Sequence, residues 1–144
     1  MTKLNNISLV STKSPFNSTK IKSAMDAVNC IRQFYGSDLG LFESFFLLLL
    51  NRANKTIGYV KISQGGVAGT VVDPKIVAKY AIDSLASSVI LCHNHPSGEC
   101  TPSQADQQIT LKIVNGLKLF DIETLDHIIL TEDSYLSFKD EGYM

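Results

Sequence analysis

A short apolar run that ends in two histidines and a proline constrains most strongly how this chain folds. Residues 89–92 are Val-Ile-Leu-Cys, and His93, Asn94, His95 and Pro96 follow directly. Such a run is typical of a buried strand, and proline ends a strand because it has no N–H to donate. Side chains alternate along a strand, so we expect His93 and His95 to project to the same side.

The signals of a helix start come soon after this strand. Thr101 is a good N-cap, Pro102 suits the first helical position, and Gln104 can complete a capping box. Ser103 and Asp106 then lie three residues apart on one helical face. We therefore expect the strand end and the first helical turn to bring together two imidazoles, a hydroxyl and a carboxylate.

Two imidazoles and one carboxylate form a ligand set that suits a catalytic zinc ion. His93, His95 and Asp106 would leave the fourth position open to water, whereas a structural zinc site normally offers four side chains, often cysteines. An isolated His-x-His pair has a plainer interpretation, because histidines at a strand end are more often ordinary surface residues. The serine, the aspartate and the helix start at fixed spacing favour the metal site.

The segment His93-Asn94-His95-Pro96, with Ser103 and Asp106 behind it, resembles the signature of the JAMM metalloproteases in the MPN-domain superfamily. The sequence HNHPSG…TPSQAD is most similar to the RadC-like JAB branch of that superfamily, and the likeness runs from about residue 42 to about residue 137. It implies an α/β (α+β) fold of three layers, a mixed sheet flanked by helices, as in JAMM and cytidine-deaminase-like domains. The mixed order of strand and helix signals independently favours such a layered fold.

The resemblance also requires a glutamate at the start of an upstream apolar strand, where Glu43 stands. From the residues alone, a solvated carboxylate is the simpler interpretation. The resemblance implies that Glu43 is a general base. General-base catalysis typically raises a reaction rate by about 10²–10⁴-fold. Ser103 would bind the attacking water or the developing oxyanion, and zinc would lower the pKa of water toward about 7. The implied activity is that of a zinc metalloprotease, a hydrolase of peptide or isopeptide bonds.

Three other functions compete with this one. A non-catalytic JAMM-fold scaffold is one, although every residue of the pattern is present. A DNA-repair-associated RadC-type role is another, but the residues before Glu43 are too few for the N-terminal helical module of full-length RadC proteins. Asn94 stands where deubiquitinating relatives have Ser or Thr, which leaves specificity for ubiquitin open. A zinc deaminase would need HxE and PCxxC motifs, which this sequence lacks.

Composition narrows the partners and the location. A chain of 144 residues suits one domain. A formal net charge of −1 offers no electrostatic footprint for nucleic acid, so we expect a peptide or protein substrate. No apolar stretch approaches the roughly 18 residues of a membrane span, and no secretory signal is recognisable. Three cysteines without a Cys-x-x-Cys pair favour a cytoplasmic location, while the oligomeric state stays open.

Three further residues lie near the motif or resemble its chemistry. Cys92 alternates away from His93 and should point into the core. Cys100 lies in the following loop and could approach the metal, although an incidental thiol is the simpler interpretation. His127 lies in a strand pattern, where a hydrogen-bonded structural histidine is the simpler role. A similar Asp-His pair in RadC-like sequences implies a supporting role for His127 near the site.

The remaining patterns divide the chain into an N-terminal part, residues 1–40, and a RadC-like JAB/MPN domain, residues 41–144. In the first part we expect a strand at 7–11 and an amphipathic helix at 18–35 that is closed by Gly36 and packs on the domain. In the second we expect strands at 42–50, 56–63, 89–95, 123–130 and 135–138 and helices at 74–86 and 102–119. The glycine-rich stretch 64–71 is expected to be a loop, since it lacks the ending of a P-loop.

Overall fold

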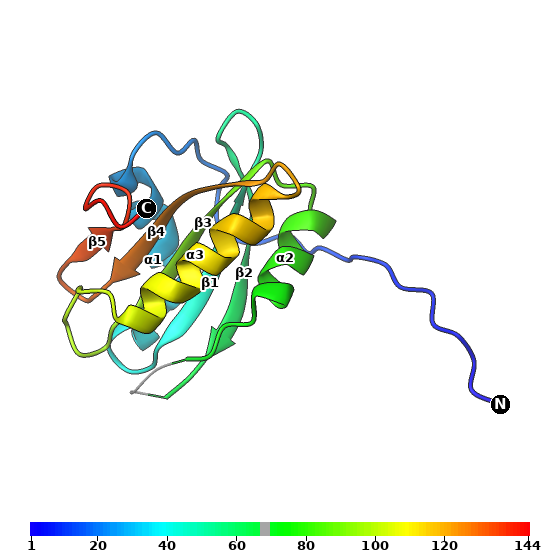
Figure 1. Ribbon diagram of the computed structural model, residues 1–144, viewed down its shortest axis with the longest axis horizontal. Helices are drawn as coiled ribbons and strands as arrows, with labels where there is room; N and C mark the ends of the chain where they lie inside the picture. The colour runs from blue at the N-terminus through cyan, green and yellow to red at the C-terminus, as the bar shows by residue number, and fades with distance from the viewer. Residues whose placement is uncertain (67–69) are drawn as a thin grey trace.

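The sheet of this protein is mixed, with strands in the order β2-β1-β3-β4-β5, and helices cover both of its faces (Figure 1). The computed structural model describes residues 1–66 and 70–144. The strands are β1 (Ser44–Leu50), β2 (Thr56–Gln64), β3 (Ser88–Asn94), β4 (Glu123–Leu130) and β5 (Tyr135–Ser137). The helices are α1 (Ala24–Tyr35), α2 (Pro74–Asp83) and α3 (Gln104–Lys118), with a short 3₁₀ helix, η1 (Gly36–Gly40), after α1.

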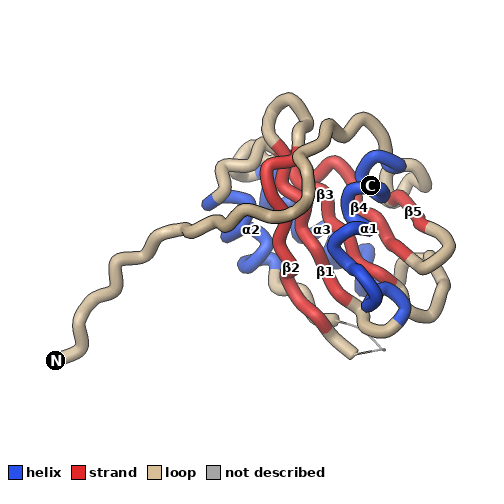
Figure 2. The backbone as a smooth tube through the Cα atoms, turned by 180° about the vertical axis from the view of Figure 1, so that it is seen from behind, coloured by secondary structure: helices blue, strands red, loops and turns tan. Residues whose placement is uncertain are grey.

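Alternating side chains build one apolar core on each face of the sheet. Phe45, Leu47 and Leu91 pack with residues of α2 and α3, while Phe46 and Leu48 pack with residues of α1. The central strands β1 and β3 are buried along their whole length, which explains their unbroken apolar sequences. Figure 2 shows α1 across the face opposite to α2 and α3. This arrangement of helix, sheet and helices confirms the predicted three-layer fold class.

The strand directions bring several element ends to one edge of the sheet. Strand β1 is antiparallel to both β2 and β3, whereas β3 and β4 are parallel and connected through α3. The start of β1, the carboxyl ends of β3 and β4, and the N-terminus of α3 therefore meet at the same edge (Figure 1). Ligand sites in open α/β sheets form outside the carboxyl ends of parallel strands.

The N-terminal segment differs from the prediction in two ways. Residues 7–11 form no strand but are exposed in a segment that leaves the body of the molecule (Figure 2). A segment rich in β-branched residues forms a strand only where it can pair with an edge strand, and none of the described strands pairs with these residues. The first helix begins at Ala24 rather than at residue 18. Ile21 donates its backbone N–H to Asn54 in the β1–β2 hairpin loop instead.

Capping explains most of the other helix boundaries. Asp73 caps α2 as predicted, by accepting a hydrogen bond from the Lys75 N–H, but the helix ends at Asp83 rather than at 86. Gly36, with φ of 55°, terminates α1 in the left-handed region that glycine tolerates. The predicted N-cap of α3 was wrong. Ser103, not Thr101, caps that helix, because a capping box with Asp106 requires the serine at that position.

The remaining boundaries agree closely with the prediction. β1 starts at Ser44 rather than at 42, β2 extends to Gln64 rather than ending at 63, β3 spans Ser88–Asn94 rather than 89–95, and β5 ends at Ser137 rather than at 138. β4 has the predicted bounds. Part of the predicted loop at 64–71 lies outside the described residues. Among the helices that the structure does describe, none has the length and apolarity that a bilayer crossing requires.

Candidate metal centre

Four predicted side chains converge at the edge of the sheet where β3 ends. The Nε2 atoms of His93 and His95 lie 2.9 Å apart. Asp106, in the first turn of α3, places Oδ1 3.4 Å from His93 Nε2 and Oδ2 3.4 Å from His95 Nε2. Oε1 of Glu43 lies 3.9 Å from His93 Nε2 and 3.7 Å from His95 Nε2. The structure therefore brings together side chains from the start of β1, the end of β3 and the first turn of α3.

Strand pairing explains why Glu43 and the histidines meet. Phe45 lies opposite His93 in the antiparallel pairing of β1 with β3. Glu43 precedes Phe45 by two residues and His95 follows His93 by two, so the alternation of side chains places all of them on one side. The backbone of Glu43 pairs with Gly65 and Gly66 beyond β2, which holds it in an extended conformation.

The capping box of α3 sets the direction of the Asp106 carboxylate. Its Oδ2 atom accepts a hydrogen bond of 2.8 Å from the Ser103 backbone N–H. In return, Ser103 Oγ accepts one of 3.0 Å from the Asp106 N–H. The hydroxyl oxygen of Ser103 is therefore occupied by the helix end, while its proton stays free to be donated. Ser103 contributes to the site first by orienting Asp106.

The electrostatics of the cluster favour a cation between the imidazoles and the carboxylates. Burial opposes ionisation of Asp106, but its interactions with His93 and His95 outweigh burial and hold the pKa of that carboxyl well below its usual range. The same interaction with Asp106 raises the pKa of His95, against the opposing effect of burial. The lowered pKa of Asp106 and the raised pKa of His95 have the same cause, because the carboxylate oxygens face imidazole nitrogens that can carry a positive charge.

The donor atoms also fit a divalent metal ion. His95 Nδ1 lies 2.6 Å from the Glu99 backbone oxygen, and a carbonyl only accepts, so Nδ1 carries the proton. When the ring is neutral, as a metal ligand must be, the lone pair of His95 Nε2 is directed at the site. Imidazole nitrogen and carboxylate oxygen are ordinary zinc ligands. Ligand atoms of Glu43, His93 and His95 all lie within 4.8 Å of one another. Asp106 is closer to both Nε2 atoms than Glu43 is.

Two buried residues behind His93 complete its surroundings. Nε2 of His127, on β4, lies 2.7 Å from Nδ1 of His93, and Thr110 Oγ1, on α3, lies 2.6 Å from Nδ1 of His127. Burial lowers the pKa of His127 well below its usual value. His127 is both the hydrogen-bonded strand histidine and the neighbour of the site that the sequence suggested. Thr110 was missed, although its helical spacing from Asp106 places the two residues on one face.

The cysteines lie outside the candidate metal centre. Cys92 is fully buried in the opposite core, as predicted, where burial raises the pKa of its thiol to about 12. Its sulfur lies 3.6 Å from the Tyr35 hydroxyl. Cys100 is half-buried, and its sulfur lies 3.9 Å from Thr131 Oγ1. Among the residues described, the group that could hold a metal contains no cysteine.

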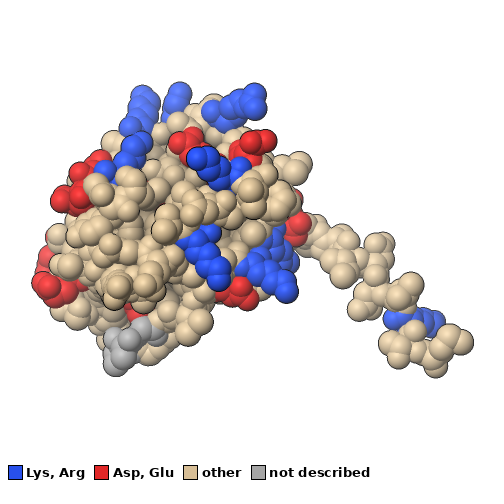
Figure 3. Space-filling view, viewed as in Figure 1, with Lys and Arg blue, Asp and Glu red and all other residues tan. Residues whose placement is uncertain are grey.

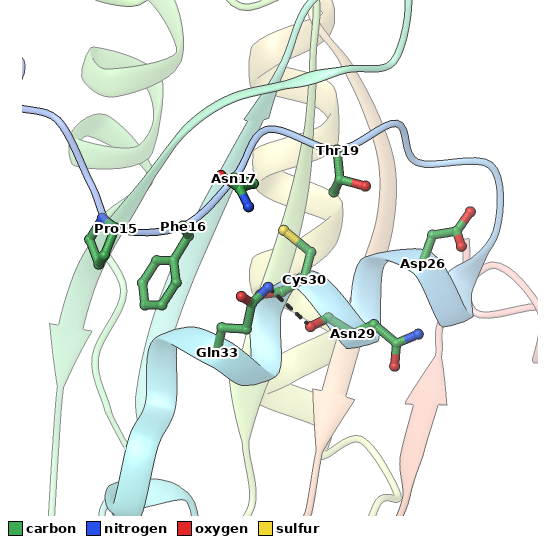
Figure 4. Close-up of a pocket in the computed structure, with 8 residues that line it drawn as sticks. All are labelled: Pro15, Phe16, Asn17, Thr19, Asp26, Asn29, Cys30 and Gln33. Atoms are coloured by element: carbon green, nitrogen blue, oxygen red, sulfur yellow. Dashed lines mark hydrogen bonds between the residues drawn. The ribbon is translucent and has the colours of Figure 1, made fainter.

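A hollow of about 320 Å³ opens between α1 and the segment before it (Figure 4). Amide, hydroxyl and phenyl groups line it, together with Cys30 and Asp26. The Asp26 carboxylate already accepts a hydrogen bond from the backbone N–H of Lys22. This hollow lies beside α1, on the face of the sheet away from α3, and brings no imidazole or paired carboxylates together, so we assign no chemistry to it.

Charged groups are mixed on the face of the molecule that carries α2 and α3. Figure 3 shows lysine and arginine side chains interspersed with aspartate and glutamate. The formal net charge of the chain is −1. That nucleic acid is not a partner remains a prediction.

Fold and site together define the class of protein, a three-layer α/β domain with a candidate metal centre of the JAB type at the sheet edge. Residues 21–143 match the family model of the RadC-like JAB domain, and the chain belongs to this family. That match begins before α1 and includes Glu43, both histidines and Asp106.

Several bacterial relatives carry the name UPF0758 protein. One from Flavobacterium johnsoniae is 48% identical over 123 residues, which cover 85% of this chain and 53% of the relative. UPF0758 protein YfjY of Escherichia coli is 42% identical over 102 residues, 71% of this chain and 64% of the relative. One from Vibrio cholerae is 38% identical over 123 residues, 84% of this chain and 78% of the relative. The chain spans about half the length of the first of these relatives.

Proposed function

We propose that this protein is a zinc-dependent hydrolase of the JAMM type that cleaves a peptide or isopeptide bond. The observation that carries the proposal is the convergence of two imidazole nitrogens and two carboxylates at the end of β3. A metal-activated water needs such a site, with three protein ligands and one further carboxylate that accepts protons. Membership of the RadC-like JAB family supports the same conclusion.

We assign His93, His95 and Asp106 as the zinc ligands and Glu43 as the general base. Asp106 lies 3.4 Å from both Nε2 atoms, and the capping box fixes its carboxylate. Glu43 stands farther away, at 3.7 and 3.9 Å, on the other strand. Glu43 is one of the residues that could hold a metal, but we assign it to the attacking water because it lies farther from both imidazole nitrogens than Asp106 and because the family pattern implies a base there.

The residues then have separate tasks in hydrolysis. A bound zinc ion supplies Lewis-acid polarisation and lowers the pKa of water toward about 7. Glu43 accepts the proton of the attacking water and passes it to the leaving amine. Ser103 donates its free hydroxyl proton to the oxyanion of the tetrahedral intermediate. The histidines and Asp106 keep their positions through the reaction.

Partners and location follow from the same chemistry. We propose a peptide or protein substrate and no nucleic-acid partner, because the charges are balanced. We propose a cytoplasmic location because all three cysteines are free, as expected in a reducing compartment.

Metal analysis combined with turnover tests this proposal. The purified protein should contain about one zinc ion and should cleave members of a library of peptides and isopeptide-linked substrates. Glu43→Gln should keep the zinc and lose turnover by about 10²–10⁴-fold. His95→Ala should lose both. Zinc without turnover in the wild type would instead indicate a metal-stabilised scaffold, and a protein that stays metal-free in excess zinc would refute the metal centre.

A further inference from the structure

The Thr110 hydroxyl has two close neighbours, and they determine where its proton points. Its Oγ1 atom lies 2.6 Å from the Asp106 backbone oxygen and 2.6 Å from His127 Nδ1. A carbonyl oxygen only accepts, and a hydroxyl has one proton, so Thr110 donates that proton to the backbone carbonyl of Asp106. Thr110 can then only accept from His127, which requires the proton of His127 to be on Nδ1.

The assignment passes from His127 to His93. The His127 ring is completely buried, with Phe45 and Phe138 against it, and such surroundings favour the neutral ring with a single proton. With that proton on Nδ1, the Nε2 atom has a lone pair, and it lies 2.7 Å from His93 Nδ1. His93 must therefore donate from Nδ1. The lone pair of His93 Nε2 is left facing His95 and Asp106.

We infer that Thr110 and His127 are positioning residues that hold His93 in its metal-binding tautomer. The chain of hydrogen bonds begins at the backbone of Asp106 on α3 and ends at His93 on β3, so it ties two of the proposed ligands together. This inference rests on the proposed function, because a fixed tautomer matters only if His93 binds a metal. Residues that hydrogen-bond a metal ligand generally change metal affinity by about 10–100-fold when they are mutated.

Thr110→Val is the informative variant, because it removes the hydroxyl and keeps the shape. Without the hydroxyl, the His127 proton no longer has an acceptor at Nδ1, so His127 can instead donate from Nε2 to His93 Nδ1. The proton of His93 would then be on Nε2, the nitrogen proposed to bind the metal. We expect zinc affinity, measured by competition with a chromophoric chelator, to fall about 10–100-fold. Thr110→Ser keeps the hydroxyl and should stay within a few-fold of wild type.

Thr124→Val is a matched control for the same change. Thr124 is a buried threonine on β4, and within the described structure its hydroxyl has no hydrogen-bond partner. The Thr124→Val variant should bind zinc as tightly as wild type. If Thr124→Val and Thr110→Val weakened zinc equally, the effect would be a general loss of packing and the inference would be wrong.

Tautomers are read directly from long-range ¹H–¹⁵N correlation spectra of metal-free protein at about pH 8. The chain has three histidines, so assignment is simple. Wild-type His93 should carry its proton on Nδ1, and Thr110→Val should lose this preference. A wild-type His93 with a proton on Nε2 and none on Nδ1 would overturn the inference without any variant. Failure of the wild type to bind zinc would overturn the proposed function instead, and the spectra would still decide the tautomer.

Discussion

The side-chain oxygen of Asn94 accepts a hydrogen bond of 2.8 Å from the backbone N–H of Ser44, the residue that follows Glu43. The Asn94 amide donates to the carbonyl oxygens of Phe42 and Leu39, each at 2.7 Å. Asn94 lies between the two histidines of the candidate metal centre but points to the other side of β3, and it is completely buried. One side chain therefore ties the histidine strand to the backbone on both sides of the proposed base.

Asn94→Ala should lower the free energy of unfolding by about 2–4 kcal/mol, because it leaves buried backbone groups without partners. Urea unfolding of the metal-free protein measures this. Asn51→Ala is the matched control. The Asn51 side chain also hydrogen-bonds to the backbone, since its Oδ1 accepts from two N–H groups. These contacts lie at the exposed hairpin loop, where water replaces them, so the loss should be about 1 kcal/mol or less. Equal losses would mean that burial of the Asn94 contacts is not decisive.

Asp106→Asn and Glu43→Gln test which carboxylate is the proposed zinc ligand and which is the proposed base. Zinc at about 100 times its dissociation constant should add about 2.7 kcal/mol to the stability of wild type. Glu43→Gln should keep this gain, whereas Asp106→Asn should lose most of it, and unfolding with zinc or with a chelator measures both. If Glu43→Gln lost the gain and Asp106→Asn kept it, the roles of the two carboxylates would have to be exchanged.

Asp126 should make the protein less stable as the pH rises. Burial raises the pKa of its carboxyl, although hydrogen bonds from Ser137, Lys139 and His127 oppose the shift. A folded pKa above the unfolded value means that the folded state binds the proton more tightly. Stability is therefore lost as the pH rises from the unfolded value, about 3.9, through the raised folded value.

Asp126→Asn should remove this loss, because an amide keeps the two backbone hydrogen bonds and never ionises. Urea midpoints of the variant and wild type should coincide near pH 3.5, and the variant should become relatively more stable toward pH 7. The opposite trend, with wild type gaining on the variant as the pH rises, would show that the carboxylate is stabilised in the folded state.

The three thiols should react at very different rates. Cys92 is completely buried and has a thiol pKa of about 12, and Cys30 is also buried with a raised pKa. Cys100 is only half-buried. A thiol-directed reagent should therefore modify Cys100 first in the native protein, as peptide mapping would show. Cys100→Ser should leave zinc affinity unchanged, and a clear loss would make Cys100 a ligand.

The sequence predicted what depends on near neighbours along the chain. Pro96 ends the histidine strand, Asp73 caps α2, and the spacing of Ser103 and Asp106 places both at the start of α3. Such signals act within a few residues, because a cap or a strand end satisfies hydrogen bonds of its own segment. They also predicted that His93, His95 and Asp106 come together, since a strand end and a helix start with this spacing have few ways to meet, whereas Glu43 was expected there only from the family resemblance.

Only the tertiary structure decided which distant groups touch. The parallel pairing of β3 with β4 puts His127 behind His93, and the antiparallel pairing with β1 puts Ser44 within reach of Asn94. Residues 7–11 form no strand although one was expected, because a segment with strand propensity still needs a neighbouring strand to pair with. Local preferences are small compared with contacts across a sheet, so the sequence alone predicted the candidate ligands, while the packing of strands determined which groups hold their side chains in place.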